Sequence, residues 1–185
     1  MKVFIYILAL TSFIAFSQKK YLKQIDSLRY INHMPYSCTS SFGPKGTRSP
    51  GCGDKIFWNI VKSKDSVINL LINKLDDPRM TKAVVALFGD NYAVADIAYV
   101  ALEEIIHSFP TYDFLQGQKE SDCGYCVYWN YVRKNITNRK KFKSAVRKWY
   151  EKNKDKLVWI KSDYQFHCGE MSFLHPNGGH YELQN

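Results

Sequence analysis

The chain has 185 residues, of which 45% are hydrophobic and 23% charged, and its formal net charge is +9. This hydrophobic fraction excludes a largely disordered protein, and the length suits one domain with its own core better than two. Lys and Arg concentrate in residues 133–161, which hold twelve of them against two acidic residues, so the basic character belongs to one element.

The first seventeen residues have the order of a secretory signal peptide. Lys2 precedes an apolar run that ends at Phe16, and small residues precede the expected cleavage point near Ser17 and Gln18. The run is shorter than the roughly 20 residues that a membrane-spanning helix requires, so no transmembrane anchor is expected. We therefore predict a signal peptide at 1–17 and an exported protein, periplasmic or extracellular, formed by residues 18–185 as a single helical domain.

A helix followed by a long loop is predicted at the start of this domain. Residues 18–32 have apolar side chains at helical spacing, whereas residues 34–53 are rich in Pro, Gly and Ser. A loop of this length inside a small domain requires a constraint or a function. Cys38 and Cys52 bracket most of it, and a disulfide between them would close a ring of about 15 residues and contribute about 3 kcal/mol.

Two short helices are predicted next. Residues 54–61 and 67–75 carry apolar residues at helical spacing, with Asp54 as a cap for the first and Pro78 as a stop after the second. Residues 81–88 form a short apolar run that a helix and a strand explain equally well.

Residues 92–107 have the clearest helical pattern in the chain, and this helix is expected to end before Pro110. Asp96 interrupts its apolar positions, and we expect it to cap the helix or to bond a neighbouring loop rather than to act as a base. Glu104 and His107 form a single ExxH, which we interpret as a surface ion pair because a di-metal site needs a second copy.

A basic amphipathic helix is predicted within residues 133–161, after an aromatic-rich helix at 123–136. Its apolar side chains recur at helical spacing from Phe142 to Tyr150, and its opposite face is basic. This face is either a solvated outer surface or a contact for an anionic surface such as lipid head groups or a polyanion. Nucleic acid is not expected, because the chain has no known recognition motif. The candidate contact residues are Lys140, Lys141, Lys143, Arg147 and Lys148.

The rest of the chain lacks clear helical periodicity. Residues 157–160 are a short apolar run, and residues from Asp163 onward contain Gly and Pro typical of loops. The patterns together predict an all-α fold, a compact bundle of five or six helices with a long Pro/Gly loop and a loop-like C-terminal tail.

Two segments resemble the helices of a HEAT-type repeat: residues 70–77 (LLINKLDD) and residues 94–105 (VADIAYVALEEI). The resemblance implies a helical hairpin and the role of a binding scaffold. The stretches GCGDKIFW, CGYCVYW, KWYEKNKDKLVW and HPNGGHY are similar to those of small exported bacterial proteins without an assigned activity.

The cysteines admit three interpretations. Disulfides are the usual state of cysteine after export, and an odd count leaves one thiol over. The CGYC at residues 123–126 also resembles the active dithiol of thioredoxin-fold disulfide isomerases, which implies redox activity. Zinc is the third interpretation, because two Cys three residues apart with distant Cys or His ligands form closed zinc sites. The disulfide candidates are Cys38, Cys52, Cys123, Cys126 and Cys168. The candidate zinc ligands are Cys52, Cys123, Cys126, Cys168, His167, His175 and His180.

The sequence therefore favours an exported helical binding or scaffold protein, held by at least one disulfide and without a cofactor. Its partner is expected to be a protein or an anionic surface. The alternative is a thiol-redox or zinc-binding protein centred on the CGYC motif. No nucleophile elbow, phosphate loop, HExxH or pair of catalytic carboxylates is present, so no catalytic residue is predicted and an enzyme is not favoured.

Overall fold

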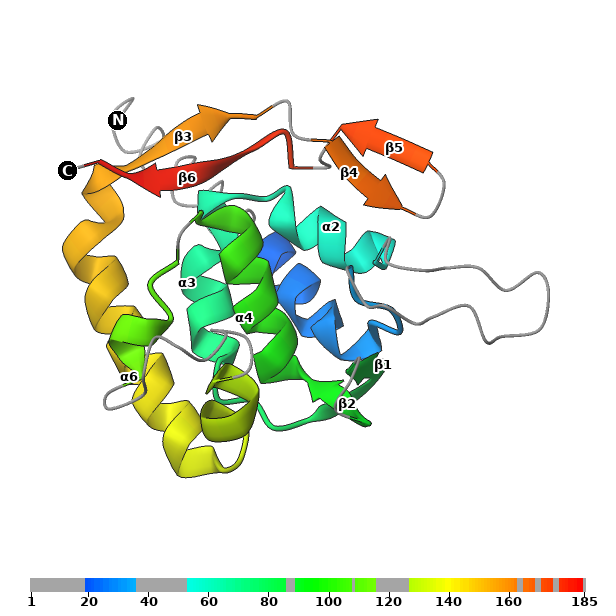
Figure 1. Cartoon of the computed structure of the whole chain (residues 1–185), viewed down its shortest axis with the longest axis vertical. Helices are drawn as coiled ribbons and strands as arrows, with labels where there is room; N and C mark the ends of the chain where they lie inside the picture. The colour runs from blue at the N-terminus through cyan, green and yellow to red at the C-terminus, as the bar shows by residue number, and fades with distance from the viewer. Residues whose placement is uncertain are drawn as a thin grey trace, which may run out of the picture.

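The structure is a computed structural model. Residues 165–168 and 171–174 are described by their backbone only. The residues that the structure describes are 19–35, 53–85, 89–107, 109–115, 127–162, 165–168, 171–174 and 177–184. Figure 1 shows a body of helices with a strand ribbon, β3 and β6, lying across one end of it. The prediction of an all-α fold is wrong, because the described residues also form three two-stranded antiparallel sheets.

The helical body is built around α4 (Val94–Ile105), which Figure 1 places at its centre. Helices α2 (Lys55–Val61) and α3 (Asp65–Lys74) pack against α4, together with a helix at 19–26 that continues into η1 (Ser27–Tyr30). Nine of the twelve residues of α4 are buried, three of them Ala, and small side chains allow neighbouring helices to approach closely. The helices predicted at 54–61, 67–75 and 92–107 are therefore confirmed within a few residues at each end.

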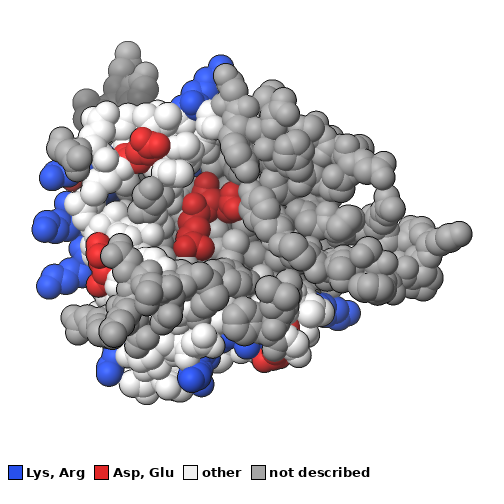
Figure 2. All heavy atoms as spheres, in the orientation of Figure 1, with Lys and Arg blue, Asp and Glu red and all other residues white. Residues whose placement is uncertain are grey.

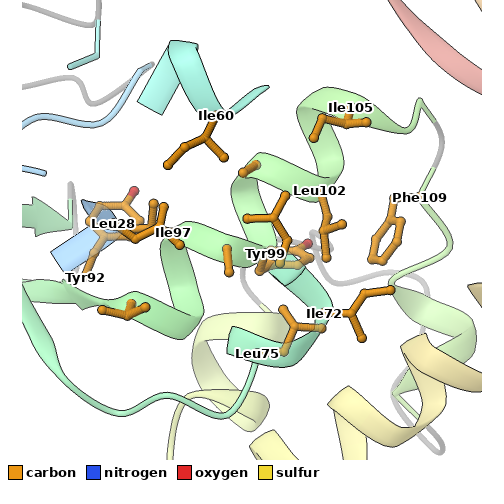
Figure 3. Close-up of a cluster of buried hydrophobic side chains, with 14 of the residues drawn as sticks. Leu28, Ile60, Ile72, Leu75, Tyr92, Ile97, Tyr99, Leu102, Ile105 and Phe109 are labelled. Carbon is orange, nitrogen blue, oxygen red and sulfur yellow. The ribbon is translucent and has the colours of Figure 1, made fainter. Parts of the chain in front are cut away.

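Aliphatic side chains from several elements meet at α4 (Figure 3). Ile97, Leu102 and Ile105 of α4 lie with Ile60 of α2 and Ile72 of α3, all of them at most 1% exposed. Fully burying one such side chain stabilises a fold by roughly 1.5 to 3 kcal/mol, so this cluster contributes substantially to holding the helices together.

Residues 81–85 of the predicted apolar run lie in a β-strand, not in a helix. Strand β1 (Met80–Val85) pairs with β2 (Asp90–Ala93), and its residues alternate strictly between exposed and buried. This alternation is the period of a strand with one face on the core. Because β1 and β2 lie between α3 and α4 in the sequence, these two helices are not joined by the short turn of a helical hairpin.

The basic helix is α6 (Ile136–Asn153), preceded by the π-helical turn η3 (Tyr128–Val132). Asn135 caps α6 through its side-chain oxygen, which accepts a hydrogen bond of 2.9 Å from the backbone N–H of Asn138. The residues that α6 buries against the body are Arg139, Phe142, Val146, Tyr150 and Asn153.

The C-terminal part of the chain forms strands, so the prediction of a loop-like tail is wrong. Two short 3-10 turns, η2 (Tyr112–Phe114) and η4 (Lys154–Lys156), lie before and after α6. The two remaining antiparallel pairs of strands follow η4. These strands are β3 (Leu157–Lys161) with β6 (Gly179–Leu183), and β4 (Gln165–Cys168) with β5 (Met171–Leu174).

Gly179 allows β6 to pair closely with β3, because it has no side chain. Its φ is +153°, and a Cβ at this position would lie 2.2 Å from the carbonyl oxygen of Ile160 on the paired strand. Contacts between the ribbon and the body include a backbone bridge and a cation–π contact. Tyr181 of β6 bridges to Ile106, and the ammonium of Lys64 lies 3.7 Å from the ring centroid of Trp159.

Candidate functional site

Most of the predicted cysteine and histidine ligands cannot be placed. Cys38, Cys52, Cys123, Cys126 and His175 lie outside the described residues. His167 and Cys168 belong to the backbone-described strand β4. The disulfide, redox and zinc interpretations therefore stay predictions.

His180 is the zinc candidate whose side chain is described. Its ring packs on that of His107 with the centroids 4.7 Å apart, and its Nε2 lies 2.9 Å from Glu182. Within the described part of the chain, no group of three or more His, Cys, Asp or Glu side chains gathers in a way that could hold a metal ion.

The five basic candidates on α6 divide into two groups. Lys143 forms an ion pair of 2.7 Å with Asp76 and donates a hydrogen bond of 2.8 Å to the carbonyl oxygen of Asn73. Arg147, one turn further along, donates to the side-chain oxygen of Asn73 at 2.6 Å. These two residues face α3, and they attach α6 to the body instead of facing solvent freely.

Lys140, Lys141 and Lys148 are exposed, and we call them the outer face of α6. Figure 2 shows Lys and Arg side chains along the edge of the molecule where α6 lies. None of these three lysines has a hydrogen bond or an ion pair with the described residues, in contrast to Lys143 and Arg147. Their charges are therefore available to a partner.

Beneath α6 lies a buried ionic cluster centred on Asp96, which is 0% exposed. Its carboxylate accepts hydrogen bonds from Tyr128 at 3.1 Å, from Arg133 at 3.2 Å and from Arg139 at 2.6 Å. It also accepts from the backbone N–H of Ala93 at 2.8 Å, which caps the start of α4 as the sequence predicted. The cluster joins α4, η3 and α6.

This arrangement gives Asp96 a structural role. Burial raises the pKa of Tyr128 well above its usual value, and the charge of Asp96 raises it further, so Tyr128 remains a neutral donor. A buried carboxylate with four donors has its acceptor sites occupied. We conclude that Asp96 holds helices together and is not placed to accept a proton from a substrate.

A second acid, Glu103, lies two turns further along α4 and is half-buried. Its carboxylate accepts a hydrogen bond from the hydroxyl of Tyr99 and a longer one, 3.3 Å, from that of Thr111. The Tyr99 ring is stacked on the Tyr128 ring with 4.0 Å between centroids, so the two acids lie on either side of a pair of aromatic rings. Figure 2 shows acidic side chains gathered near the middle of the face, over α4.

Glu103 differs from Asp96 in having no basic partner among the described residues. Burial raises the pKa of Glu103 to about 7, against the effect of its two hydroxyl donors, which lower it. Sequence patterns did not single out Glu103 or Thr111. The sequence pattern that could have identified Glu103 is its position four residues after Tyr99, on one face of a helix that is otherwise mostly apolar.

Comparisons with protein-family models, with curated proteins and with solved structures find no match to this chain. No helix in the part of the chain that the structure describes is long and apolar enough to cross a membrane. Functional arguments therefore depend on the residues themselves, and chiefly on the outer face of α6 and on Glu103.

Proposed function

We propose that this protein is a small exported binding protein that contacts an anionic surface through the outer face of α6. The observation that carries the proposal is the contrast on this helix between two kinds of cation. Lys143 and Arg147 are engaged with α3, whereas Lys140, Lys141 and Lys148 are exposed and have no interaction with the described residues.

The spacing of these lysines suits an extended contact. A helix rises about 1.5 Å per residue, so Lys141 and Lys148 lie about 10 Å apart along the axis, and residues three, four and seven apart share one face. Lys152, also exposed, continues the same line. Attachment of α6 through its other face holds these charges in a fixed row, so little conformational freedom of the backbone is lost on binding.

The contact is expected to be purely electrostatic. The apolar residues Phe142, Val146 and Tyr150 are buried against the body of the protein, so α6 has no free apolar face to insert among lipid chains. A lysine beside an anionic membrane contributes about 1 kcal/mol, so three contribute about 3 kcal/mol, less than the 4.1 kcal/mol of a millimolar complex. Such binding is weak, reversible and sensitive to salt.

The test measures binding of the mature protein to phosphatidylcholine vesicles with and without phosphatidylglycerol. Binding to the anionic vesicles is expected at low salt and should largely disappear at about 0.15 M salt, where charges are screened within about 8 Å. A parallel arm with immobilised heparin distinguishes a lipid surface from a sulfated polysaccharide.

The matched variants carry three Lys→Gln changes each. The test variant changes Lys140, Lys141 and Lys148, and the control changes three exposed lysines on other elements, which are Lys23, Lys55 and Lys62. Loss of binding in the test variant and its retention in the control would support the proposal. Equal loss in both variants would mean that overall net charge, not the outer face of α6, attracts the surface.

A further inference from the structure

The chain returns to α4 directly after leaving it. Residues 109–115 lie against the C-terminal half of α4, and Figure 3 shows Phe109 on this segment near Leu102. Thr111 is 4% exposed, and its hydroxyl lies 3.0 Å from that of Tyr99 and 3.3 Å from the carboxylate of Glu103. Glu103 and Tyr99 thus form the polar attachment of this segment to α4.

The same segment also packs against α6 through its aromatic rings. The centroids of Phe109 and Phe114 lie 5.6 Å and 6.0 Å from that of Trp149, and Phe114 is 5.8 Å from Phe142. These edge-on contacts fill the space between α4 and α6. A change in the attachment at Thr111 would therefore alter the packing of these aromatic rings against α6.

The charges around Glu103 do not neutralise it. Glu104 on α4 adds a like charge, and the phenols of Tyr99 and Tyr128 are neutral. Arg133 and Arg139, the cations of the neighbouring cluster, are bonded to Asp96 instead. The carboxylate is therefore half-buried and held by two hydroxyl groups, without an ion-pair partner among the described residues. Asp113, on the segment itself, is exposed.

We propose that Glu103 is a pH-operated latch that holds residues 109–115 on α4 when it is protonated and favours their release when it is ionised. A neutral carboxyl group tolerates this partly buried position, whereas an ionised one without a cation gains by opening to water. Opening would expose Trp149 and Phe142 of α6 on the side where the segment now covers them. The device is independent of the anionic-surface proposal, since it involves none of the three outer-face lysines.

The direction and size of the effect follow from linkage. The pKa of Glu103 is about 7 in the closed form, because burial raises it, against an ordinary value of 4.5 for a carboxyl open to water. Opening should therefore become more frequent as the pH rises from about 4.5 to about 7 and should level off above this range. This difference in pKa between the closed and open forms limits the pH-dependent change in the opening constant to about 300-fold.

Hydrogen exchange of the backbone amides in the segment tests the latch. The N–H groups of Asp113, Phe114 and Leu115 are hydrogen-bonded within the segment, so their exchange, corrected for its intrinsic pH dependence, reports opening. In the wild-type protein we expect the opening constant to rise at least tenfold between pH 5 and pH 7.5. The near-isosteric variant Glu103→Gln should abolish this rise, and the neighbouring variant Glu104→Gln should retain it.

A carboxyl-carbon NMR titration of the unmodified protein is the second measurement. Glu103 should titrate near neutral pH, well above the ordinary value of 4.5 for a glutamate. A normal Glu103 titration, or an unchanged pH dependence of exchange in Glu103→Gln, would overturn the proposal. The NMR result remains decisive if a variant fails to fold.

Discussion

Removing the charge of Asp96 is the most severe test of how the helices are held together. In Asp96→Asn, Arg139, whose side chain is 6% exposed, loses the carboxylate that it contacts at 2.6 Å, and Arg133 loses its contact at 3.2 Å. Breaking a buried ion pair by removing one partner costs about 3 to 5 kcal/mol, because a buried charge is left without compensation. For a domain of this size the unfolding temperature should fall by about 10 °C, at about 2 to 4 °C per kcal/mol.

A matched control exists on the same arginine. Asp90 pairs with Arg133 at 2.8 Å, but its side chain is 57% exposed, so Asp90→Asn should cost no more than about 1 kcal/mol. Urea unfolding followed by far-ultraviolet circular dichroism gives the free energy of unfolding of each variant. Similar losses in the two variants, or a loss below about 1 kcal/mol in Asp96→Asn, would refute the argument that the cluster holds α4, η3 and α6 together.

Three further predictions concern stability and the cysteines. Because the folded-state pKa of Glu103 is raised from 4.5 to about 7, its contribution to stability is complete below pH 4.5 and is lost as the pH rises through 7. Glu103→Gln should therefore be more stable than the wild type at pH 8 by about 1 to 2 kcal/mol, with the difference disappearing by pH 4 in urea titrations. Gly179→Ala should lower the unfolding temperature clearly more than Gly178→Ala. A Cβ at Gly179 would meet the carbonyl oxygen of Ile160, whereas a Cβ at Gly178 would meet nothing within 4 Å. Equal decreases in the two variants would contradict the geometry of the β3–β6 ribbon. Thiol counting on the denatured protein with and without reductant, beside elemental analysis, should find at least one disulfide and no stoichiometric zinc, and five free thiols with one zinc ion would reverse this prediction.

The helices were predictable from the sequence because their signals are local. Several apolar side chains recur at the helical period in each of residues 54–61, 67–75 and 92–107. Each helix buries the face on which these apolar side chains lie. The prediction for α6 placed its apolar stripe correctly, since Phe142 and Val146 are buried. It could not show that Lys143 and Arg147 contact α3, whose residues lie about 70 positions earlier.

The strands were missed for a physical reason. β3 and β6 have five residues each, and their pairing joins segments separated by about 20 residues, which a local period does not reveal. The role of Gly179 as a residue without a side chain against Ile160 is visible once the strands are paired. The importance of Glu103 likewise depends on Thr111 returning to α4 after the helix has ended.

Lysine footprinting tests the central claim, that the outer face of α6 is the contact surface, most directly. The protein is acetylated sparingly at low salt with and without anionic vesicles, and the modification of each lysine is measured by mass spectrometry. The account predicts that vesicles protect Lys140, Lys141 and Lys148, while Lys23 and Lys62, exposed on other elements, react equally in both conditions. Uniform protection of all five lysines, or protection of Lys23 and Lys62 with the outer face still reactive, would contradict it.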